Sequence, residues 1–376
     1  MAEDRKTEIV IIGAGMFGSE LVAKFRKASN SQTRNIRLTV IDARQDFVFY
    51  PLNIRNCIED VSGMVATPYD RMFDKKPELG RFIRGKVVSV NAQGKTVHLE
   101  SGGDPIRYDY LVLSTGSRFP DPNRIPLGDH EQVISYFDSL RDQIRDNYHV
   151  VLIGGGPTGC QLAAELGDYY RSQKKITLVH SGNLPLSDLY STKLRQQVLT
   201  YLLQSRAEVM LKSTGVDNND GTVSVTRQGV SEPILVNGDL VLHTHGALPA
   251  TEWIPAEWKN EQGRVKVSSQ LQVEGAGPEV FAMGDIIETT AARTGTKQQF
   301  AVPVVFNNLL SLINGKLDMK VYKPPKLEDI LLVMGRWRGA GQSAFPVVGE
   351  VLIPDFMITS HCKTAGAELA AKSLGY

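Results

Sequence analysis

Two glycine-rich turns give the most specific chemical signal in the sequence. Each has the spacing GxGxxG, follows an apolar run (EIVII or HVVLI) and precedes a stretch with the apolar periodicity of a helix. The first glycine of such a turn permits a tight bend, the second lets a pyrophosphate approach the backbone, and the third lets helix and strand pack closely. The positive end of the helix favours an anion. We therefore expect two dinucleotide sites, with the cofactor-binding residues Gly13, Ala14, Gly15, Met16, Phe17 and Gly18 in one and Gly154, Gly156 and Gly159 in the other.

The strand that follows each turn ends differently. Asp42 closes IRLTVID, where a carboxylate can accept hydrogen bonds from a ribose diol. KITLVHS has no acid and ends in His180 and Ser181. A 2′-phosphate is not repelled there, so the second unit is predicted to accept NADPH as well as NADH. His180 is either a partner for that phosphate when protonated or a solvent-facing histidine at a strand end.

Two further segments are interpreted as nucleotide-binding only because the two glycine turns are present. Ser114, Thr115 and Gly116 close the first unit at a strand end, where the glycine lets the backbone approach a cofactor. Asp285 follows the apolar FAMG and can hold a polyol hydroxyl, such as the ribitol of a flavin. Taken alone, either piece is better explained as a simple turn.

The strand, turn and helix pattern occurs twice, which predicts an α/β fold with two Rossmann-like three-layer domains. We expect a discontinuous FAD domain at 1–120 and 250–320, an NAD(P)H domain at 121–249 between its halves, and a small α+β C-terminal domain at 321–376. Helices are expected at 130–147 and from about 298 to 313. The segment 85–117 is expected to form antiparallel strands, because Asn-Ala-Gln-Gly and Ser-Gly-Gly-Asp favour turns.

Composition narrows the class of protein. The formal net charge is +1, which gives no support for binding nucleic acid. No apolar run is long enough to span a membrane, and the N-terminus resembles no targeting segment, so we expect a cytoplasmic protein. Cys57, Cys160 and Cys362 are scattered, which excludes a disulfide framework or a thiolate zinc site. No metal site is expected.

The order of these motifs resembles the two-dinucleotide flavoprotein superfamily. Several stretches are similar to its apoptosis-inducing-factor-like branch, which includes ferroptosis suppressor protein and fungal relatives; type II NADH:quinone oxidoreductases share the architecture. The stretches are DFVFYPLNIRNC, ITLVHSGNLPLSDLYSTKLRQQV, LQVEGAGPEVFAMGD and LLVMGRWRGAGQ. The resemblance covers nearly the whole chain and implies FAD and NAD(P)H as cofactors.

The resemblance also implies roles for matched positions. Gly13 to Phe17 would hold the FAD pyrophosphate, Asp42 the adenosine ribose and Asp285 the ribitol. Three more residues gain roles only in this way: Arg55 near the FAD phosphates, Val88 at the adenine through its backbone, and Lys297 near the flavin ring. A cation there can stabilise the anionic reduced ring. The alternative for Lys297 is a solvated surface lysine.

Two departures from the family pattern bear on catalysis. The family often carries Glu two residues after the last glycine of the second turn, where this chain has Gln161. Gln161 can bind the nicotinamide carboxamide but cannot act as a base, and hydride transfer needs none. The region that carries a redox CxxxxC in disulfide reductases has only Cys57, so a dithiol relay is excluded.

The expected function is an FAD-dependent NAD(P)H oxidoreductase that passes hydride to the flavin and electrons to a quinone. The alternatives are an NAD(P)H oxidase that makes peroxide from oxygen, and a low-turnover NADH-sensing protein linked to cell death. The apolar segment 344–358 is expected either to form strands that cover the flavin or to touch a mitochondrial or other membrane peripherally and admit a lipid quinone. The oligomeric state stays open.

Overall fold

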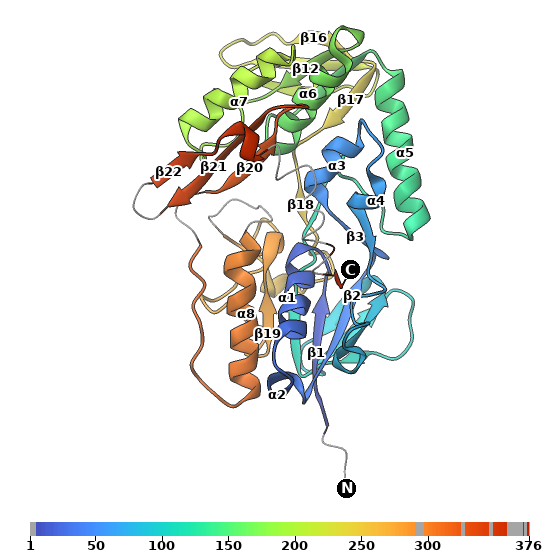
Figure 1. Ribbon diagram of the computed structural model, residues 1–376, viewed down its shortest axis with the longest axis vertical. Helices are drawn as coiled ribbons and strands as arrows, with labels where there is room; N and C mark the ends of the chain where they lie inside the picture. Colours follow the sequence, from blue (N-terminus) through green and yellow to red (C-terminus); the bar gives the residue numbers. More distant parts are fainter. Residues whose placement is uncertain are drawn as a thin grey trace.

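The computed structural model describes residues 5–289, 297–324, 328–345, 349–358, 371, 374 and 375. Two parallel sheets, each with its own core, dominate the molecule (Figure 1).

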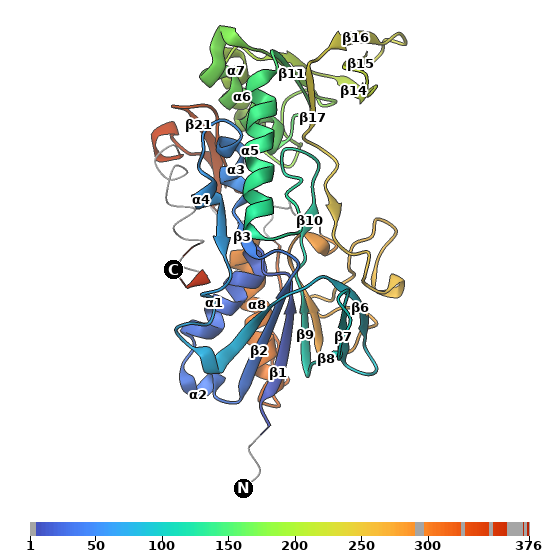
Figure 2. The same ribbon diagram turned by 90° about the vertical axis from the view of Figure 1, so that its right-hand side faces the viewer.

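The first sheet has the strand order β19-β9-β1-β2-β5, and all its neighbouring strands are parallel. Helices α1 and α8 lie side by side on one face (Figure 1), and a three-stranded antiparallel sheet lies on the other (Figure 2). Because both faces are covered, the central strands are almost continuously apolar. The elements are β1 (Thr7–Ile12), α1 (Met16–Lys27), β2 (Ile36–Asp42), β5 (Gly80–Arg84), β6 (Val87–Asn91), β7 (Thr96–Leu99), β8 (Ile106–Arg107), β9 (Tyr110–Leu113), β19 (Val280–Ala282) and α8 (Gln298–Ile313).

The second sheet repeats this plan with the order β13-β12-β11-β17, again all parallel. Helices α5, α6 and α7 accompany it, and the antiparallel strands β14, β15 and β16 pack valines onto its other face. The elements are α5 (His130–Asp146), β11 (His149–Ile153), α6 (Pro157–Tyr170), β12 (Lys175–Val179), α7 (Thr192–Gln204), β13 (Glu208–Met210), β14 (Ser213–Asp217), β15 (Thr222–Arg227), β16 (Ile234–Asn237) and β17 (Leu240–His243).

The chain passes between the two units twice. The outgoing passage contains β10 (Ser117–Arg118) and the returning passage contains β18 (Leu248–Pro249), and the two strands pair antiparallel. The remaining short elements are α2 (Asn30–Thr33), β3 (Asp46–Val48), α3 (Tyr50–Asn56), α4 (Ser62–Val65), β4 (Ala66–Pro68) and 3₁₀ turns at Pro77–Leu79, Arg171–Gln173, Ala256–Trp258 and Gly284–Ile286.

The C-terminal strands form one antiparallel sheet, β20-β21-β22, from β20 (Ile330–Val333), β21 (Gly339–Phe345) and β22 (Gly349–Leu352). Its buried side chains join the core of the second unit: Ile330 and Leu332 cluster with Leu162 and Val198 of α6 and α7. Figure 1 shows the sheet lying against these helices, above α8. The C-terminal sheet is therefore packed as a part of the second unit.

The predicted fold class is confirmed: the chain folds as two Rossmann-like units with parallel sheets and a small C-terminal piece. The expected helices at 130–147 and 298–313 are α5 and α8. One expectation is wrong. The strand β9, at the end of the segment expected to be wholly antiparallel, joins the parallel sheet beside β1, because its apolar run Leu111–Leu113 is buried on both faces.

Candidate active site

Four neighbouring strands of the first sheet end in predicted site residues. Gly13 follows β1, Asp42 ends β2, Ser114 to Gly116 follow β9, and Asp285 follows β19 by way of Gly284. Because these strands are parallel neighbours, their carboxyl ends lie along one edge of the sheet. The structure thus brings together residues that are 243 positions apart (Asp42 to Asp285) at the edge where open α/β sheets bind ligands.

The first glycine turn has the shape of a phosphate cradle. Gly13 has a φ of 94°, and a Cβ there would strike the backbone of Ser114. A Cβ on Gly18 would overlap the carbonyl oxygen of Gly13, whereas one on Gly15 would meet nothing within 4 Å. The space beside Gly15 is therefore left open, and α1 begins there without a side-chain cap. Its first N–H groups are available to an anion.

Three side chains hold this turn in place. The carboxylate of Asp42 accepts a hydrogen bond from the Ala14 N–H at 2.8 Å, and Tyr69 donates to the Ala14 carbonyl at 2.9 Å. The hydroxyl of Ser114 donates to the Gly13 carbonyl at 2.7 Å. Asp42 thus has a structural task in addition to its predicted contact with the adenosine ribose.

The second turn repeats this geometry. Gly154 has a φ of 121°, a Cβ on Gly159 would overlap the Gly154 carbonyl oxygen, and one on Gly156 would meet nothing within 4 Å. Thr244 donates to the Gly154 carbonyl at 2.6 Å, as Ser114 does in the first unit. Helix α6 also starts without a side-chain cap, whereas α5 and α7 are capped by Asp129 and Ser191. Both predicted dinucleotide turns therefore offer unused N–H groups at an open glycine.

His180 takes the place in the second unit that Asp42 takes in the first. Its Nδ1 accepts a hydrogen bond from the Gly155 N–H at 3.2 Å, and its Nε2 is buried. Burial lowers the pKa of His180, an effect opposed in part by hydrogen bonding with the Leu186 and Leu184 backbone. Since Nδ1 is an acceptor here, the imidazole is neutral. The histidine is thus built into the turn and is not a solvent-facing side chain.

The residues at the middle of the first edge are linked to each other. Ser117 donates to the carboxylate of Asp285 at 3.0 Å, and Thr115 donates to the carbonyl of Ala250 at 2.7 Å. Gly116 has open space where a Cβ would lie, and the ring of Phe17 lies against Gly284. Met16 and Phe17 form the first turn of α1 and pack partly buried against the core.

Val88 lies in an irregularity of β6. The pairing register of β6 with β7 shifts between Val87 and Ser89, so Val88 is the extra residue and its side chain is 42% exposed. The extra residue of a bulge is left out of the hydrogen-bond ladder. This geometry is compatible with the predicted contact of its backbone with adenine, and β5, just before it, pairs with the end of β2 at Asp42.

Arg55 is paired across the two units. Its Nη2 lies 2.5 Å from Oε1 of Glu165 on α6, and their side chains are only 16% and 6% exposed. Burial raises the pKa of Glu165, and Arg55 opposes that rise. The Nε of Arg55 is buried without a hydrogen-bond partner among the described residues, which leaves one donor for the predicted contact with the FAD phosphates.

Gln161 contacts the C-terminal sheet. Its amide oxygen accepts a hydrogen bond from the Val333 N–H at 3.0 Å. Two helical turns further along α6, Asp168 pairs with Arg338 at 2.5 Å. Because its amide oxygen is already used, Gln161 would bind a nicotinamide carboxamide through its amide N–H₂ group.

Lys297 is a buried cation and not a solvated surface lysine. It is 4% exposed, precedes α8, and places its Nζ 2.5 Å from Oε2 of Glu328. Among the residues that the structure describes, Nζ has no hydrogen-bond partner. An ammonium has three donors, so this arrangement suits a further polar or anionic group. The open Gly15, the uncapped α1 and the unsatisfied Lys297 are all features that FAD would fit.

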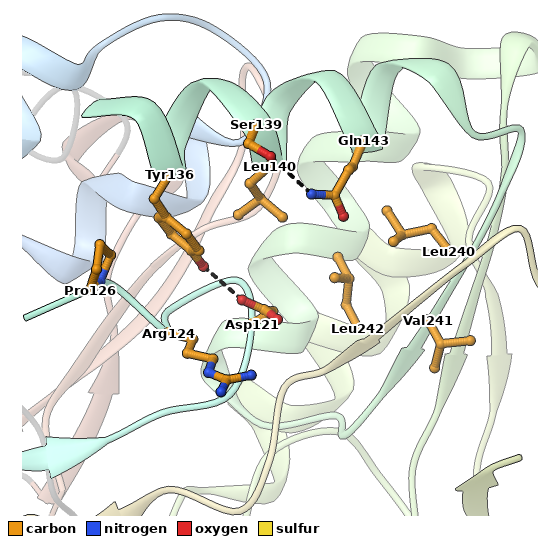
Figure 3. Close-up of a pocket in the computed structure, with 10 residues that line it drawn as sticks. All are labelled: Asp121, Arg124, Pro126, Tyr136, Ser139, Leu140, Gln143, Leu240, Val241 and Leu242. Carbon is orange, nitrogen blue, oxygen red and sulfur yellow. Dashed lines mark hydrogen bonds between the residues drawn. The ribbon is translucent and has the colours of Figure 1, made fainter. Parts of the chain in front are cut away.

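A separate cavity of about 360 Å³ lies between α5, the passage 121–126 and the start of β17 (Figure 3). Tyr136 donates to Asp121 at 2.9 Å beside it, and Leu140 and Leu242 supply apolar walls. None of the predicted site residues lines it. It lies beside the beginning of β17, whereas Thr244 at the second glycine turn follows the end of that strand.

Sequence reasoning missed Tyr69, Glu165, Thr244 and Glu328. None of them left a local signal: LVLHTHG at 240–246 matches LVLSTGS at 111–117, but that match aligns Thr244 with Thr115 and not with Ser114, whose place it takes. The other three reach the site from distant segments. Within the described residues no group of His, Cys, Asp and Glu could hold a metal ion, and no helix is long and apolar enough to cross a membrane.

This fold and site define a two-dinucleotide-binding flavoprotein oxidoreductase. The chain belongs to the pyridine nucleotide-disulphide oxidoreductase family, whose model matches residues 7–301. The predicted resemblance to the apoptosis-inducing-factor-like branch is also confirmed. Apoptosis-inducing factor homolog A of Dictyostelium discoideum is 27% identical over 87% of this chain and 82% of its own. Ferroptosis suppressor protein 1 of Xenopus tropicalis is 28% identical over 90% and 89%.

Solved structures show the same fold at lower identity. The sulfide:quinone oxidoreductase of Aquifex aeolicus superposes with a TM-score of 0.79 at 16% identity, over 98% of this chain and 91% of that chain. NDH2 of Plasmodium falciparum, in complex with NADH, gives 0.78 at 15% identity, over 99% and 96%.

Proposed function

We propose that this protein is an FAD-dependent NAD(P)H oxidoreductase that reduces a quinone. The observation that carries the proposal is the pair of equivalent glycine turns, at Gly15 and Gly156, each open to a ligand beside an uncapped helix. One such turn would serve a single dinucleotide. Two turns on two units suit an enzyme that brings two dinucleotides together.

FAD would be held by the first unit, 1–120 with 250–320. The turn from Gly13 to Gly18 would bind its pyrophosphate, Asp42 and Val88 its adenosine, and Asp285 its ribitol. Arg55 and Lys297 would supply positive charge at the phosphates and at the ring. The bound flavin would supply the redox chemistry, accepting a hydride from NAD(P)H and passing the electrons on.

The nicotinamide nucleotide would be held by the second unit, 121–249, through Gly154, Gly156 and Gly159. His180 contributes no negative charge where an acid would repel a 2′-phosphate, so both NADH and NADPH would bind. Gln161 would orient the carboxamide through its amide N–H₂ group.

The quinone is supported by the likeness to the sulfide:quinone oxidoreductase, which names that acceptor. The C-terminal domain, 321–376, would meet a membrane peripherally, because Trp337, Phe356 and Met357 are 69%, 72% and 52% exposed. Exposed large apolar groups of this kind favour an interface. A cytoplasmic protein that docks on a membrane in this way would reach a lipid quinone.

Stopped-flow absorbance of the purified protein tests the proposal. After the bound flavin has been quantified, the protein is mixed anaerobically with NADH or NADPH, with and without a short-chain quinone. We expect rapid flavin bleaching and quinone-dependent reoxidation over many turnovers. Reoxidation by oxygen alone, with peroxide formed and no effect of quinone, would instead identify an oxidase. A persistent long-wavelength band that quinone does not discharge would identify a low-turnover sensor.

A further inference from the structure

The ion pair between Lys297 and Glu328 joins the first unit to the C-terminal sheet. Lys297 stands at the start of α8, and Glu328 lies two residues before β20. Their side chains are 6% and 5% exposed, and their charged atoms are 2.5 Å apart. A buried ion pair loses the hydration of both charges, so it is a poor way to gain stability alone.

The backbone at Glu328 is held firmly by the second unit. Gln342, which is fully buried on β21, donates from Nε2 to the Glu328 carbonyl at 2.7 Å. The Oε1 of Gln342 accepts hydrogen bonds from the Ser191 N–H at 3.1 Å and from its hydroxyl at 2.7 Å. The backbone that presents the Glu328 carboxylate to Lys297 is thus held by two other parts of the chain, β21 and the start of α7.

The ammonium of Lys297 is paired with the charge of Glu328 but does not form a hydrogen bond with it. Lys297 Nζ makes no hydrogen bond to the part of the chain that the structure describes, although it is buried. Lys297 stands at the start of α8, which packs along α1, and the N-terminus of α1 begins at the phosphate cradle. Among the described residues nothing hydrogen-bonds the remaining donors of Lys297, which suits a group bound along this edge of the sheet.

We propose that Glu328 is a positioning residue that sets the reduction potential of the bound flavin by partly neutralising Lys297. This inference rests on the proposed function, in which FAD binds with its ring near Lys297. Reduction adds negative charge to the ring, and a nearby cation favours that charge more strongly in a water-excluded site. A carboxylate on the far side of the cation opposes this effect. Glu328 therefore keeps the potential lower than Lys297 alone would make it.

The test is a redox titration of flavin absorbance in the parent protein and in Glu328→Gln, Lys297→Met and the double variant. Neutralising Glu328 is expected to raise the midpoint potential. The ratio of reduced to oxidised flavin at a fixed solution potential should rise about tenfold, which is about 30 mV for a two-electron couple. Lys297→Met should lower the potential. In the Lys297→Met background, Glu328→Gln should have much less effect, because the charge through which Glu328 acts is gone.

Glu350→Gln is the matched control, because Glu350 also accepts from Gln342 Nε2 but is not paired with Lys297. The midpoint potential of the flavin in Glu350→Gln should equal that in the parent protein. If Glu328→Gln does not retain flavin, Glu328→Asp is measured in its place. Its shorter side chain keeps the negative charge but holds it further from Lys297, so we expect a smaller rise in the midpoint potential. An unchanged potential in a flavin-loaded Glu328 variant, or an equal shift with and without Lys297, overturns the inference and leaves the proposed function standing. A parent protein that binds no flavin overturns both.

Discussion

Arg55 and Glu165 form a buried contact between the two nucleotide units, with 2.5 Å between Nη2 and Oε1. Arg55 comes from α3 beside the first unit and Glu165 from the helix that starts at the second glycine turn. Burial raises the pKa of Glu165, and the guanidinium limits that rise. Arg55 therefore favours the charged form of Glu165 at the junction where the two dinucleotides are proposed to meet.

Replacing Arg55 with Met should destabilise the protein in a pH-dependent way. Glu165 would lose the partner that lowers its pKa, so its folded pKa would lie further above the unfolded value. Stability associated with such a group is present at low pH and is lost as pH rises through the folded pKa. We expect a loss of about 3–5 kcal/mol at pH 8 that shrinks as the pH falls toward 5. Urea unfolding at both pH values measures it.

The double variant Arg55→Met/Glu165→Gln is the control for this prediction. It removes the unpaired acid, so most of the stability at pH 8 should return and the pH dependence should flatten. A loss that is the same at pH 5 and pH 8 in the single variant would show that the pair contributes packing alone.

Substitutions at different glycines of each turn should affect either cofactor binding or folding, depending on the position. Gly15→Val adds a side chain where a Cβ meets nothing, so the protein should fold but lose FAD. Gly156→Val should keep FAD but lose reduction by NADH. Gly18→Ala and Gly159→Ala place a Cβ onto a backbone oxygen and should destabilise the fold itself. Flavin absorbance, circular dichroism and stopped-flow reduction distinguish these outcomes; full flavin content in Gly15→Val would contradict the assignment of the first turn.

His180→Asp should make the second unit prefer NADH over NADPH. An aspartate there can still accept a hydrogen bond from the Gly155 N–H, as Asp42 does from Ala14, but it would repel a 2′-phosphate. We expect kcat/KM for NADPH to fall at least tenfold while that for NADH changes little. His180→Asn is the uncharged control and should keep both activities. Equal losses with the two nucleotides would exclude a role in discrimination.

The parent protein should show little pH dependence of this preference near neutrality. Because burial lowers the pKa of His180, the ring stays neutral above its ordinary titration range. The ratio of NADPH to NADH activity should therefore be flat between pH 7 and 8. A steep rise in that ratio from pH 8 to pH 7 would show that a protonated His180 binds the phosphate.

Cys57 and Cys160 should be inert toward alkylation in the native protein. Burial raises the pKa of both thiols to about 12, so the thiolate is scarce at pH 8. Cys362 lies outside the described residues, so the measurement uses a Cys362→Ser variant. Mass spectrometry after treatment with iodoacetamide should find no label until denaturant is added. Labelling of either cysteine in the folded protein would contradict the burial seen here.

The local part of the site could be predicted from the sequence, and the part made by distant segments could not. The roles of Gly13 and Gly18 are set by neighbours within one turn, so spacing alone predicts them. The contact between Lys297 and Glu328 depends on how the C-terminal sheet packs against α8, which no local pattern reports. Gln161 shows the same limit, since its contact with Val333 comes from a strand 172 positions away.

The C-terminal sheet shares one buried core with α6 and α7, and Ile54 and Ile58 from the α3 region join the same core. If the second unit rotates to admit a nucleotide, the sheet must travel with it, because their side chains share one core. Glu328 would then be carried with the sheet while Lys297 stays with α8. Rotation and the ion pair would be thermodynamically linked, so an event that stretches the pair would change nucleotide affinity, and nucleotide binding would change the pair to the same extent.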